Sequence, residues 1–485
     1  MHSEKEYLRK IRNLENRLYN FKEKSKCQSA EIKKLRADVR RITGGRNDWK
    51  GKYTNKKQEI RQLAVELKRK EKPPRHHYSL DLMKFCVMLR LIGKCSYRGI
   101  SRILVVVNVC FNLKISKLPC ANSVENWVSK MGYFLLQTPD NRLVEDDVCL
   151  IVDESAGVGS EKVLMILACP AKKSKEGPLD FKQTSVCYMR GQKSWTGEQI
   201  AQALKEVEAS NRFKVRYVLS DEVSVMLSGS KLFEKPHVID ISHAMASCLR
   251  KTFKKDEGYT QFTKQVASYQ AKAVNRSLSY LRPPKQRTKA RFMNVKPVVD
   301  WARILLNKFD SLDNQEKKFF HELPINESTL KELTICLALA QSISLIIKTK
   351  GIAKNSIQRA RRVIKKYMKM EGNIGVFSNH VDDYLVKYEN FIAKSDCSFN
   401  ACTDIIESLF GKYKAMTNNT PYMGLSMICL ELPTYSVQQE DIESTLETAL
   451  REIFVSDLIQ WNHEKSTENQ AAKRRKFFRK MKMVS

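Results

Sequence analysis

The chain has 485 residues, of which 42% are hydrophobic and 29% are charged. This length exceeds the size at which one hydrophobic core stops growing, so two to four structural units are expected. The sequence contains no apolar run long enough to span a bilayer, and its first residues are charged where a secretory signal would be apolar. These features argue against a membrane or exported protein and predict one that works inside the cell.

Lys and Arg number 86 against 53 Asp and Glu, a net charge of +33. Lys and Arg that neutralise phosphates release counterions, so this excess indicates a nucleic-acid partner. A generally solubilising basic surface is the alternative. The thirteen cysteines include no CxxC pair, which suits a reducing compartment. Cys397 and Cys402 lack a second pair at zinc-finger spacing, so buried free thiols are the better interpretation.

Apolar residues in segment 1–72 alternate in steps of three and four, which is typical of a coiled coil. This stripe consists of Ile11, Leu14, Leu18, Phe21, Ile32, Leu35, Val39, Ile42, Trp49, Tyr53, Ile60, Leu63 and Leu67. Gly44-Gly45 and polar core positions such as Arg46 and Lys56 interrupt the repeat, so we expect two helices with a hinge. The segment is predicted to pair two protomers into a homodimer or higher oligomer. A helical hairpin within one chain is the alternative.

Lys72-Pro73-Pro74 ends the first segment, and a small helical domain is predicted over residues 77–140. Three helical patterns follow one another, over Leu80–Ile92, Ser96–Val106 and Asn122–Leu136. Three short helices favour a helix-turn-helix that binds double-stranded DNA. The last helix would present polar side chains to a major groove, namely Ser123, Asn126, Ser129 and Lys130. A plain three-helix bundle has the same pattern.

Residues 145–243 change to a strand pattern. Strands are predicted at Val148–Val152, Lys162–Cys169, Lys182–Met189, Val215–Leu219 and Val238–Ile241, and helices at Thr196–Val207 and near Val223–Leu227. This order is that of a ribonuclease H-like α/β core with a mixed five-stranded sheet. In that topology the first and fourth strands lie side by side at the centre of the sheet.

After residue 243 the strand signal fades. An all-α insertion is predicted over residues 244–400, with helices at Val298–Phe309, Leu330–Ile347 and Ile357–Met368. Its basic segment Arg276–Arg291 lies either near a phosphate backbone or in solvent. Residues 401–433 return to the core through a helix at Ala401–Met416. Residues 434–485 form a helix at Ile442–Trp461 and a basic tail at Lys473–Lys482, which is expected to be disordered until it meets nucleic acid.

Two acids follow buried strands. Asp153 comes directly after the first strand and Asp221 after the fourth, and each alone reads as a cap or turn residue. The two acids together indicate a metal site more strongly than either does alone, because adjacent strands would bring both carboxylates within reach of one divalent cation. A third acid is expected on the helix at residues 401–416, where Glu407 lies beside the apolar stripe. Asp404, one turn earlier, is its main competitor, and an ordinary amphipathic helix with surface acids is the alternative.

Three clustered carboxylates repel one another unless a cation is present. Hard oxygen ligands select hard ions, so the sequence predicts two Mg²⁺ ions held by Asp153, Asp221 and Glu407, with Mn²⁺ as a possible substitute. Two such ions support in-line phosphodiester chemistry. The sequence contains no Walker loop, no GxSxG elbow and no HExxH motif.

With these residues in place, the chain resembles the DDE transposases of bacterial insertion sequences. The resemblance covers roughly residues 145–430 and rests on Ile151-Val152-Asp153-Glu154-Ser155, Val218-Leu219-Ser220-Asp221, Asp240-Ile241-Ser242-His243 and the stretch 405–414. It implies that His243 contacts the scissile phosphate or supports the metal site. A structural histidine at a helix start is the alternative.

Glu407 and Lys414 reproduce the glutamate-to-lysine spacing of a transposase signature whose lysine binds a terminal DNA phosphate. The chain departs from the rest of that signature, with Thr403 and Asn400 in place of an arginine and a tyrosine. The resemblance also allows a helical insertion whose tryptophan stacks on a flipped base. Trp301 is the only tryptophan in that region, and a buried core role is the alternative.

The resemblance implies an enzyme that binds the terminal inverted repeats of a mobile element, cleaves phosphodiester bonds there and joins the freed 3′-hydroxyl to target DNA. Lys412, Lys414 and the basic tail would bind phosphate. Such an enzyme would be cytoplasmic and associated with the nucleoid, or nuclear in a eukaryotic host. The alternatives are a noncatalytic dimeric DNA-binding regulator derived from a transposase and a ribonuclease H-like nuclease.

Overall fold

The structure is a computed structural model, and it describes residues 2–69, 72–143, 147–155, 161–173, 177–273, 278–286, 291–393, 398–416, 424–468 and 470–484. Cys397 and, within the basic segment 276–291, residues 276–277 and 287–290 therefore lie outside the described residues. The chain divides into two compact units. One consists of Met1–Phe85 and Arg98–Pro119, and the other of Cys86–Tyr97 and Cys120–Ser485.

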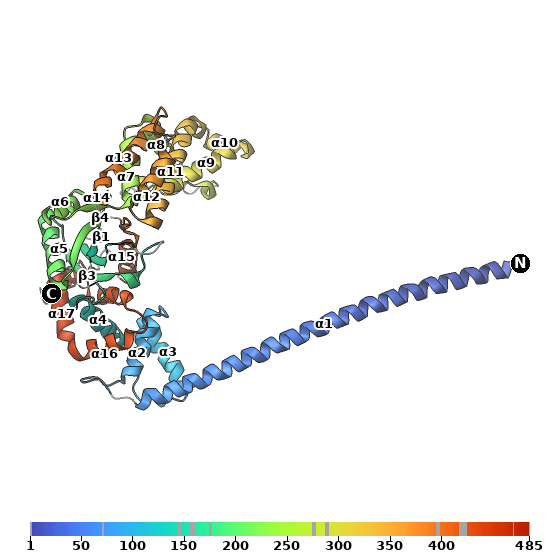
Figure 1. Cartoon of the computed structure of the whole chain (residues 1–485). Coiled ribbons are helices and arrows are strands. Elements are labelled where there is room, and N and C mark those ends of the chain that lie inside the picture. The colour runs from blue at the N-terminus through green and yellow to red at the C-terminus, as the bar shows by residue number, and fades with distance from the viewer. Residues whose placement is uncertain are drawn as a thin grey trace. The chain divides into compact units, whose positions relative to one another are not determined.

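Helix α1 runs from His2 to Arg69 without a break (Figure 1). The prediction of two helices with a hinge is wrong, because the helix continues through Gly44-Gly45. A cost of about 1 kcal/mol for each glycine does not end a helix whose neighbours are mostly strong helix formers. The apolar stripe lies along this helix, and its side chains with described exposure are between 38% and 75% exposed, from Ile60 to Trp49.

Five strands form one mixed sheet, as predicted. They are β1 (Asp147–Ser155), β2 (Lys162–Pro170), β3 (Ser185–Gln192), β4 (Lys214–Ser220) and β5 (His237–Ile239). Their order across the sheet is β3-β2-β1-β4-β5. β1 pairs antiparallel with β2 and β2 with β3, whereas β1–β4 and β4–β5 are parallel. The first and fourth strands thus lie side by side at the centre of the sheet.

The central strands are continuous apolar runs because both faces of the sheet are covered. Leu150, Val152 and Val218 face a core that includes α5 (Gly197–Asn211) and α6 (Ser224–Leu232). Ile151 and Leu219 face the other core, to which α7 (Ile241–Phe253) and α15 (Asp404–Met416) contribute. This second face carries the candidate site.

Between α7 and α15 the described chain is helical, as predicted. The α-helices there are α8 (Glu257–Lys272), α9 (Lys296–Asn307), α10 (Asn314–Phe319), α11 (Glu327–Lys350), α12 (Lys354–Ile364), α13 (Asn373–Lys387) and α14 (Glu389–Ala393). Short 3-10 turns lie at η2 (Ser279–Leu281), η3 (Arg291–Asn294), η4 (Phe309–Ser311) and η5 (Leu323–Asn326). In Figure 1 these helices form a separate layer beyond the edge of the sheet.

Among the described residues, Leu323–Lys350 is one stretch long and apolar enough to cross a bilayer by length and composition, and 44% of its most apolar window is buried. It consists of η5 and α11. Helix α11 packs against α7, α8, α9, α12 and α13. A central position in the helical layer accounts for its apolar residues.

The C-terminal part corrects two predictions. The helix expected at residues 442–461 is divided into α16 (Ile442–Glu452) and α17 (Val455–Lys465). The break lies at Phe454, whose backbone N–H donates to Asp457 2.7 Å away and so begins a new helix. The tail expected to be disordered forms α18 (Gln470–Val484). Before α16 and after α15, the segment η6 (Met427–Ser436) forms a long 3-10 turn, and a shorter one, η1 (Phe181–Gln183), precedes β3.

The three predicted N-terminal helices exist as α2 (Leu80–Leu91), α3 (Tyr97–Cys110) and α4 (Ala121–Gln137). Helix α4, however, packs against η6 and α16, and Gly132 lies directly against the backbone of Leu430. The side chains of Ser129 and Lys130 are 2% and 7% exposed, and the Ser129 hydroxyl donates to the carbonyl of Met427. The prediction that α4 presents Ser129 and Lys130 to a DNA groove is therefore wrong.

Candidate active site

The central strands bring Asp153 and Asp221 to one edge of the sheet. The parallel pairing of β1 with β4 ends at Ile151 and Leu219, and each aspartate lies two residues beyond that pair. Residues two apart on a strand face the same side, so both carboxylates belong to the side covered by α7 and α15. β1 continues to Ser155 through its pairing with β2, so Asp153 lies within this strand and not at its end.

Helix α7 places His243 between two carboxylates. Nε2 of the His243 ring lies 3.0 Å from Oδ1 of Asp221 and 3.7 Å from Oε1 of Glu407. Asp153 adjoins Asp221 closely enough for the two charges to interact. The structure thus brings together four residues that are far apart in the sequence, Asp153, Asp221, His243 and Glu407.

The two candidate acids on α15 have different surroundings. Both carboxylate oxygens of Asp404 accept hydrogen bonds from Nζ of Lys348, at 2.8 and 2.6 Å. Glu407 is one turn further along and approaches His243. Its side chain is 46% exposed, whereas those of Asp221 and His243 are less exposed. Of the two acids, Glu407 is the one that joins the cluster.

Asp240 connects the elements that carry the cluster. Its side chain is fully buried, and its backbone N–H donates to the carbonyl of Ser220, directly before Asp221. Oδ1 accepts from the backbone N–H of His243 at 2.9 Å, which caps α7, and Oδ2 accepts from the backbone N–H of Thr403 at 2.8 Å, at the start of α15. One side chain thus fixes the end of β4 and the starts of α7 and α15 relative to one another.

Burial and the closeness of the charged side chains shift the pKa values in the cluster. Burial, together with the charge of Asp221, raises the pKa of Asp153 well above its usual range. Burial also raises the pKa of Asp221 to about 6, although the positive charge of His243 opposes this. Burial lowers the pKa of His243, but its hydrogen bond with Glu407 and the nearby carboxylates outweigh burial and raise that pKa to about 8. His243 is therefore a cation near neutral pH.

Among the residues that the structure describes, no three His, Cys, Asp or Glu side chains are arranged so that they could hold a metal ion. The imidazole of His243 lies between Asp221 and Glu407 and neutralises part of their charge. The donor set nevertheless fits a hard divalent cation in kind, because it consists of three carboxylates. Burial is the main cause of the raised pKa values of Asp153 and Asp221, and neighbouring carboxylates, whose charge such a cation would neutralise, add to it.

The two lysines predicted to bind phosphate lie on different sides of α15. Seven residues make almost two full helical turns, so Lys414 shares the side of Glu407, and it is half-buried. Nζ of Lys412 lies 4.7 Å from the ring centre of Tyr435 and 5.4 Å from that of Phe181. Lys412 therefore contacts aromatic rings within this unit.

Two other predicted residues belong to the packing of the molecule. Trp301 is partly buried, donates from Nε1 to the carbonyl of Leu281 and contacts Phe320 edge-on, which is the core role. Asn126 is half-buried on α4, the helix that packs against η6.

Sequence reasoning missed the link from Asp240 to Thr403 and the ion pair of Lys348 with Asp404. The first had a partial signal, since an aspartate directly before the first residue of a helix is typical of an N-cap, which predicts the bond to the backbone of His243 but not the bond to Thr403. The second had none, because its partners are 56 residues apart and lie on different helices.

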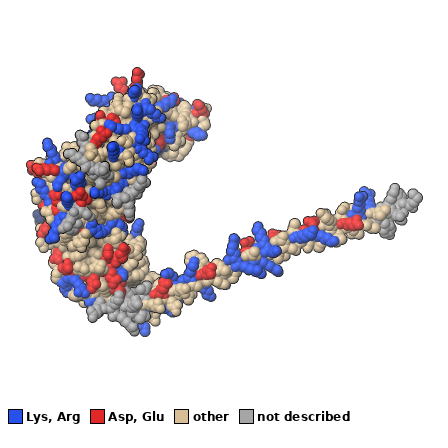
Figure 2. All heavy atoms as spheres, viewed as in Figure 1, with Lys and Arg blue, Asp and Glu red and all other residues tan. Residues whose placement is uncertain are grey.

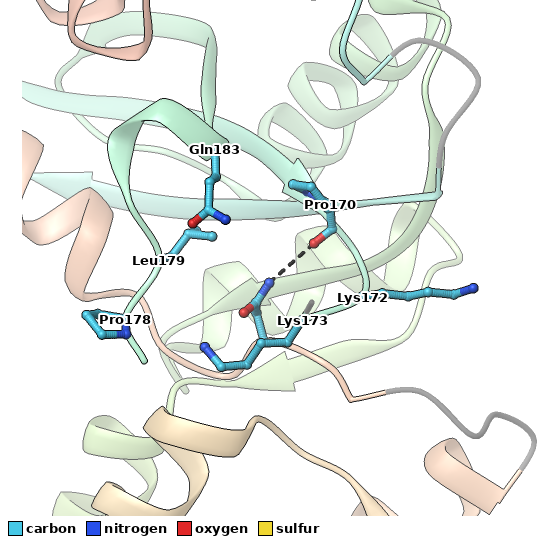
Figure 3. Close-up of a pocket in the computed structure, with 7 residues that line it drawn as sticks. Pro170, Lys172, Lys173, Pro178, Leu179 and Gln183 are labelled. Carbon is cyan, nitrogen blue, oxygen red and sulfur yellow. Dashed lines mark hydrogen bonds between the residues drawn. The ribbon is translucent and has the colours of Figure 1, made fainter. Parts of the chain in front are cut away.

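A small pocket lies at the other end of β1 and β2. Pro170 pairs with Val148, near the start of β1, whereas Asp153 pairs with Met165. Figure 3 shows the side chains of Lys172, Lys173 and Gln183 around this pocket, and the amide of Asn400 donating to the carbonyl of Pro170 at 3.2 Å. The pocket is distinct from the carboxylate cluster.

No family model matches the chain, and no curated protein is similar enough to count as a relative.

Proposed function

We propose that this chain is a DDE transposase with a ribonuclease H-like catalytic core. The observation that carries the proposal is the meeting of Asp153, Asp221 and Glu407, with His243 among them, on one face of the sheet. The strand order β3-β2-β1-β4-β5 supports it, because the first and fourth strands lie side by side at the centre of the sheet, as predicted for such a core.

Asp153, Asp221 and Glu407 would hold two Mg²⁺ ions, for which Mn²⁺ can substitute. When bound, such ions activate an attacking hydroxyl and stabilise the leaving oxygen of an in-line phosphodiester displacement. The two aspartates come from neighbouring strands, so their separation is set by the sheet. Glu407 comes from a helix and is the most exposed of the three, so DNA would approach the cluster from its side.

His243 supplies a positive charge beside the reacting phosphate. Its pKa of about 8 keeps the ring protonated near neutral pH, so Nε2–H can donate to a phosphate oxygen when DNA displaces a carboxylate contact. Asp240 holds the backbone of His243 by a hydrogen bond, which fixes where that charge stands. Lys414 shares the side of Glu407 and would contact the DNA end.

Helix α1 would pair two protomers so that both element ends meet in one complex. Its exposed apolar stripe supports this role, because such a stripe is covered when two copies form a coiled coil. The basic residues of α18 would add phosphate contacts, since most of them are exposed on a helix.

The test of this function is strand transfer. Full-length protein is incubated with Mg²⁺, a supercoiled plasmid and duplex DNA that carries the sequences flanking its gene, and products that join the duplex 3′-ends to the plasmid are measured. The proposal predicts joined products. Cleaved ends that are never joined would favour the nuclease, and tight end binding without cleavage in Mg²⁺ or Mn²⁺ would favour the regulator.

A further inference from the structure

Helix α12 and the turn after it carry an uninterrupted run of cations. Between Gly351 and Glu371 the sequence has seven Lys or Arg residues and no Asp or Glu. Six of these cations are exposed, and we call them the α12 basic face: Lys354, Arg359, Arg362, Lys365, Lys366 and Lys369. Lys354, Arg359 and Arg362 lie within α12, where 3.6 residues per turn put them on one side of the helix. Lys365, Lys366 and Lys369 follow at its C-terminal end and in the turn after it.

The opposite side of α12 is buried. Ile357, Ala360 and Ile364 are at most 2% exposed and lie in the core that α11 and α13 share. The hydroxyl of Ser356 donates to the carbonyl of Gly351 and fixes the start of the helix. Packing therefore determines which side of α12 faces outward.

Arg361, the seventh cation, has a structural role on this helix. Arg361 forms ion pairs with Asp382 on α13, at 2.8 Å, and with Glu389 on α14. Among the residues that the structure describes, none of the six cations of the α12 basic face forms an ion pair with a carboxylate. Arg361 is thus the cation of this stretch that pairs with acids on neighbouring helices.

A surface that carries only cations, such as the α12 basic face, lowers the stability of the folded protein unless a partner neutralises its charge. Like charges three or four residues apart on a helix destabilise it by about 0.2–0.5 kcal/mol per pair, and Arg359 and Arg362 form such a pair within α12. Surfaces that serve solubility alone intersperse both signs. Helix α1 does so, since Asp and Glu recur among its Lys and Arg (Figure 2). The α12 basic face does not.

The start of α12 is tied to the segment that leads into α15. The backbone N–H of Ile352 donates to the carbonyl of Phe399 at 2.8 Å, and that of Phe399 donates back at 3.0 Å. Gly351, at φ +71, approaches Ser398 and Phe399 so closely that a Cβ would clash with both. Glu407 lies on α15, a few residues after this segment. Figure 1 shows α12 at the end of the helical layer nearest α15.

We propose that the α12 basic face binds the phosphate backbone of the duplex DNA whose end lies in the carboxylate cluster. The inference rests on the proposed function and adds a second contact surface to it. From Lys354 to Lys365 the helix rises about 16 Å, which spans about five phosphates of one strand at about 3.4 Å each. The contacts are to phosphates, so they carry affinity and not sequence preference.

The experiment replaces three cations of this face in the full chain, as Arg362→Gln/Lys366→Gln/Lys369→Gln. Binding to a fluorescent duplex of arbitrary sequence is measured from about 50 to 200 mM NaCl. If all three contact phosphate, the slope of log affinity against log salt should become less steep by about 2.7, and affinity near 100 mM should fall about tenfold or more. The single variant Lys366→Gln should change the slope by about 0.9.

A matched control removes the same charge from cations that already have partners. Arg303, Lys331 and Arg451 pair with Asp300, Glu327 and Glu447 on exposed helix surfaces. The triple variant of these residues to Gln should bind with the wild-type slope. Equal losses in both triple variants would overturn the inference, because total charge alone would then account for them.

The outcomes separate this inference from the proposed function. If the wild type binds no duplex DNA, the proposed function itself fails. If the wild type binds and the α12 variant keeps its affinity and slope, only the inference fails. Loss of affinity for an RNA duplex or anionic vesicles, with DNA binding unchanged, would also overturn it. Circular dichroism checks that the variants fold, and Lys366→Gln alone decides the question if the triple variant does not.

Discussion

Asp221 and His243 lie 3.0 Å apart, with the pKa of the carboxyl raised to about 6 and that of the imidazole raised to about 8. Because the folded carboxyl holds its proton more tightly than the unfolded one, its contribution to stability is fully present below about pH 3.8 and is lost as the pH rises through about 6. The protonated imidazole adds stability that is lost as the pH rises through about 8. Both effects favour the folded chain at the lower pH.

A divalent cation should reverse this dependence at high pH. Carboxylate ligands must lose their protons before they bind a metal, so Mg²⁺ should raise the Tm clearly near pH 8 and little near about pH 5. The measurement is thermal unfolding across this range with Mg²⁺ or with a chelator. The variant Asp221→Asn should lose most of the Mg²⁺-dependent increase. A Tm that does not change with Mg²⁺ at any pH would contradict the assignment of these carboxylates as metal ligands.

The sequence identified Asp153 and Asp221 because each follows a run of apolar residues, which is a local pattern. It favoured Glu407 over Asp404 but kept Asp404 as a competitor, since both lie on the same helix one turn apart. The difference depends on Lys348, which comes from α11 and pairs with Asp404. The burial of Lys130 was equally invisible, because it depends on η6, about 300 residues later in the chain.

At the scale of elements, the site depends on how β4, α7 and α15 are joined. Asp240 makes one contact to each, through its own backbone N–H and its two carboxylate oxygens. The backbone N–H of Ile241 also donates to the carbonyl of Ala401 at 3.0 Å. The starts of α7 and α15 are thus held together by two hydrogen bonds.

Replacing Asp240 by Ala should loosen this junction. It leaves the backbone N–H groups of His243 and Thr403 without their acceptor, at a cost of about 1–3 kcal/mol each. We expect lower unfolding free energy and DNA cleavage reduced more than DNA binding. Asp256→Ala is the matched control, because Asp256 caps α8 through the backbone N–H of Tyr259 and lies outside the cluster. Its cleavage should remain at the wild-type rate in a somewhat less stable protein. Equal cleavage by Asp240→Ala and the control would contradict a positioning role for Asp240.

Helices and strands whose apolar residues follow a clear periodic pattern were predictable. The residues at which these elements end or break were less predictable. The strands around the sheet follow from apolar runs that need burial on both faces. The continuity of α1 and the break at Phe454 depend on small local contributions to helix stability. In α1 two glycines are tolerated, and at Phe454 the side chain of Asp457 caps a new helix. Helix α18 forms where the composition indicated disorder, with Phe477 and Phe478 exposed between its cations.

At the scale of the whole molecule, α1 presents an apolar stripe that needs a partner. We expect full-length protein to be a dimer or larger assembly and a chain that begins at residue 72 to be a monomer. Leu18→Lys/Leu35→Lys should dissociate the assembly, because it places charges in the seam. Asn20→Lys/Ala30→Lys, outside the stripe, is the control. Light scattering across protein concentrations measures this, and a monomeric wild type or an assembly that survives the loss of α1 would contradict it.

The position of the helical insertion in the chain was predictable from the sequence, but the packing of its helices was not. Its place between α7 and α15 followed from the loss of strand signal. How its helices pack did not, because α11 is apolar on several sides and the same pattern suits many arrangements. The tie between Ile352 and Phe399, which joins α12 to the core, is a non-local pairing with no periodic signature.

The most direct test of the central claim is Mg²⁺-dependent cleavage of DNA that carries the sequences flanking the gene. Wild type is compared with Asp221→Asn and with Asp404→Asn, which changes an acid on α15 outside the cluster. We expect Asp221→Asn to lose cleavage by about a thousandfold or more while still binding DNA, and Asp404→Asn to cleave like the wild type. Cleavage that survives in a folded Asp221→Asn protein would contradict the carboxylate cluster as the active site.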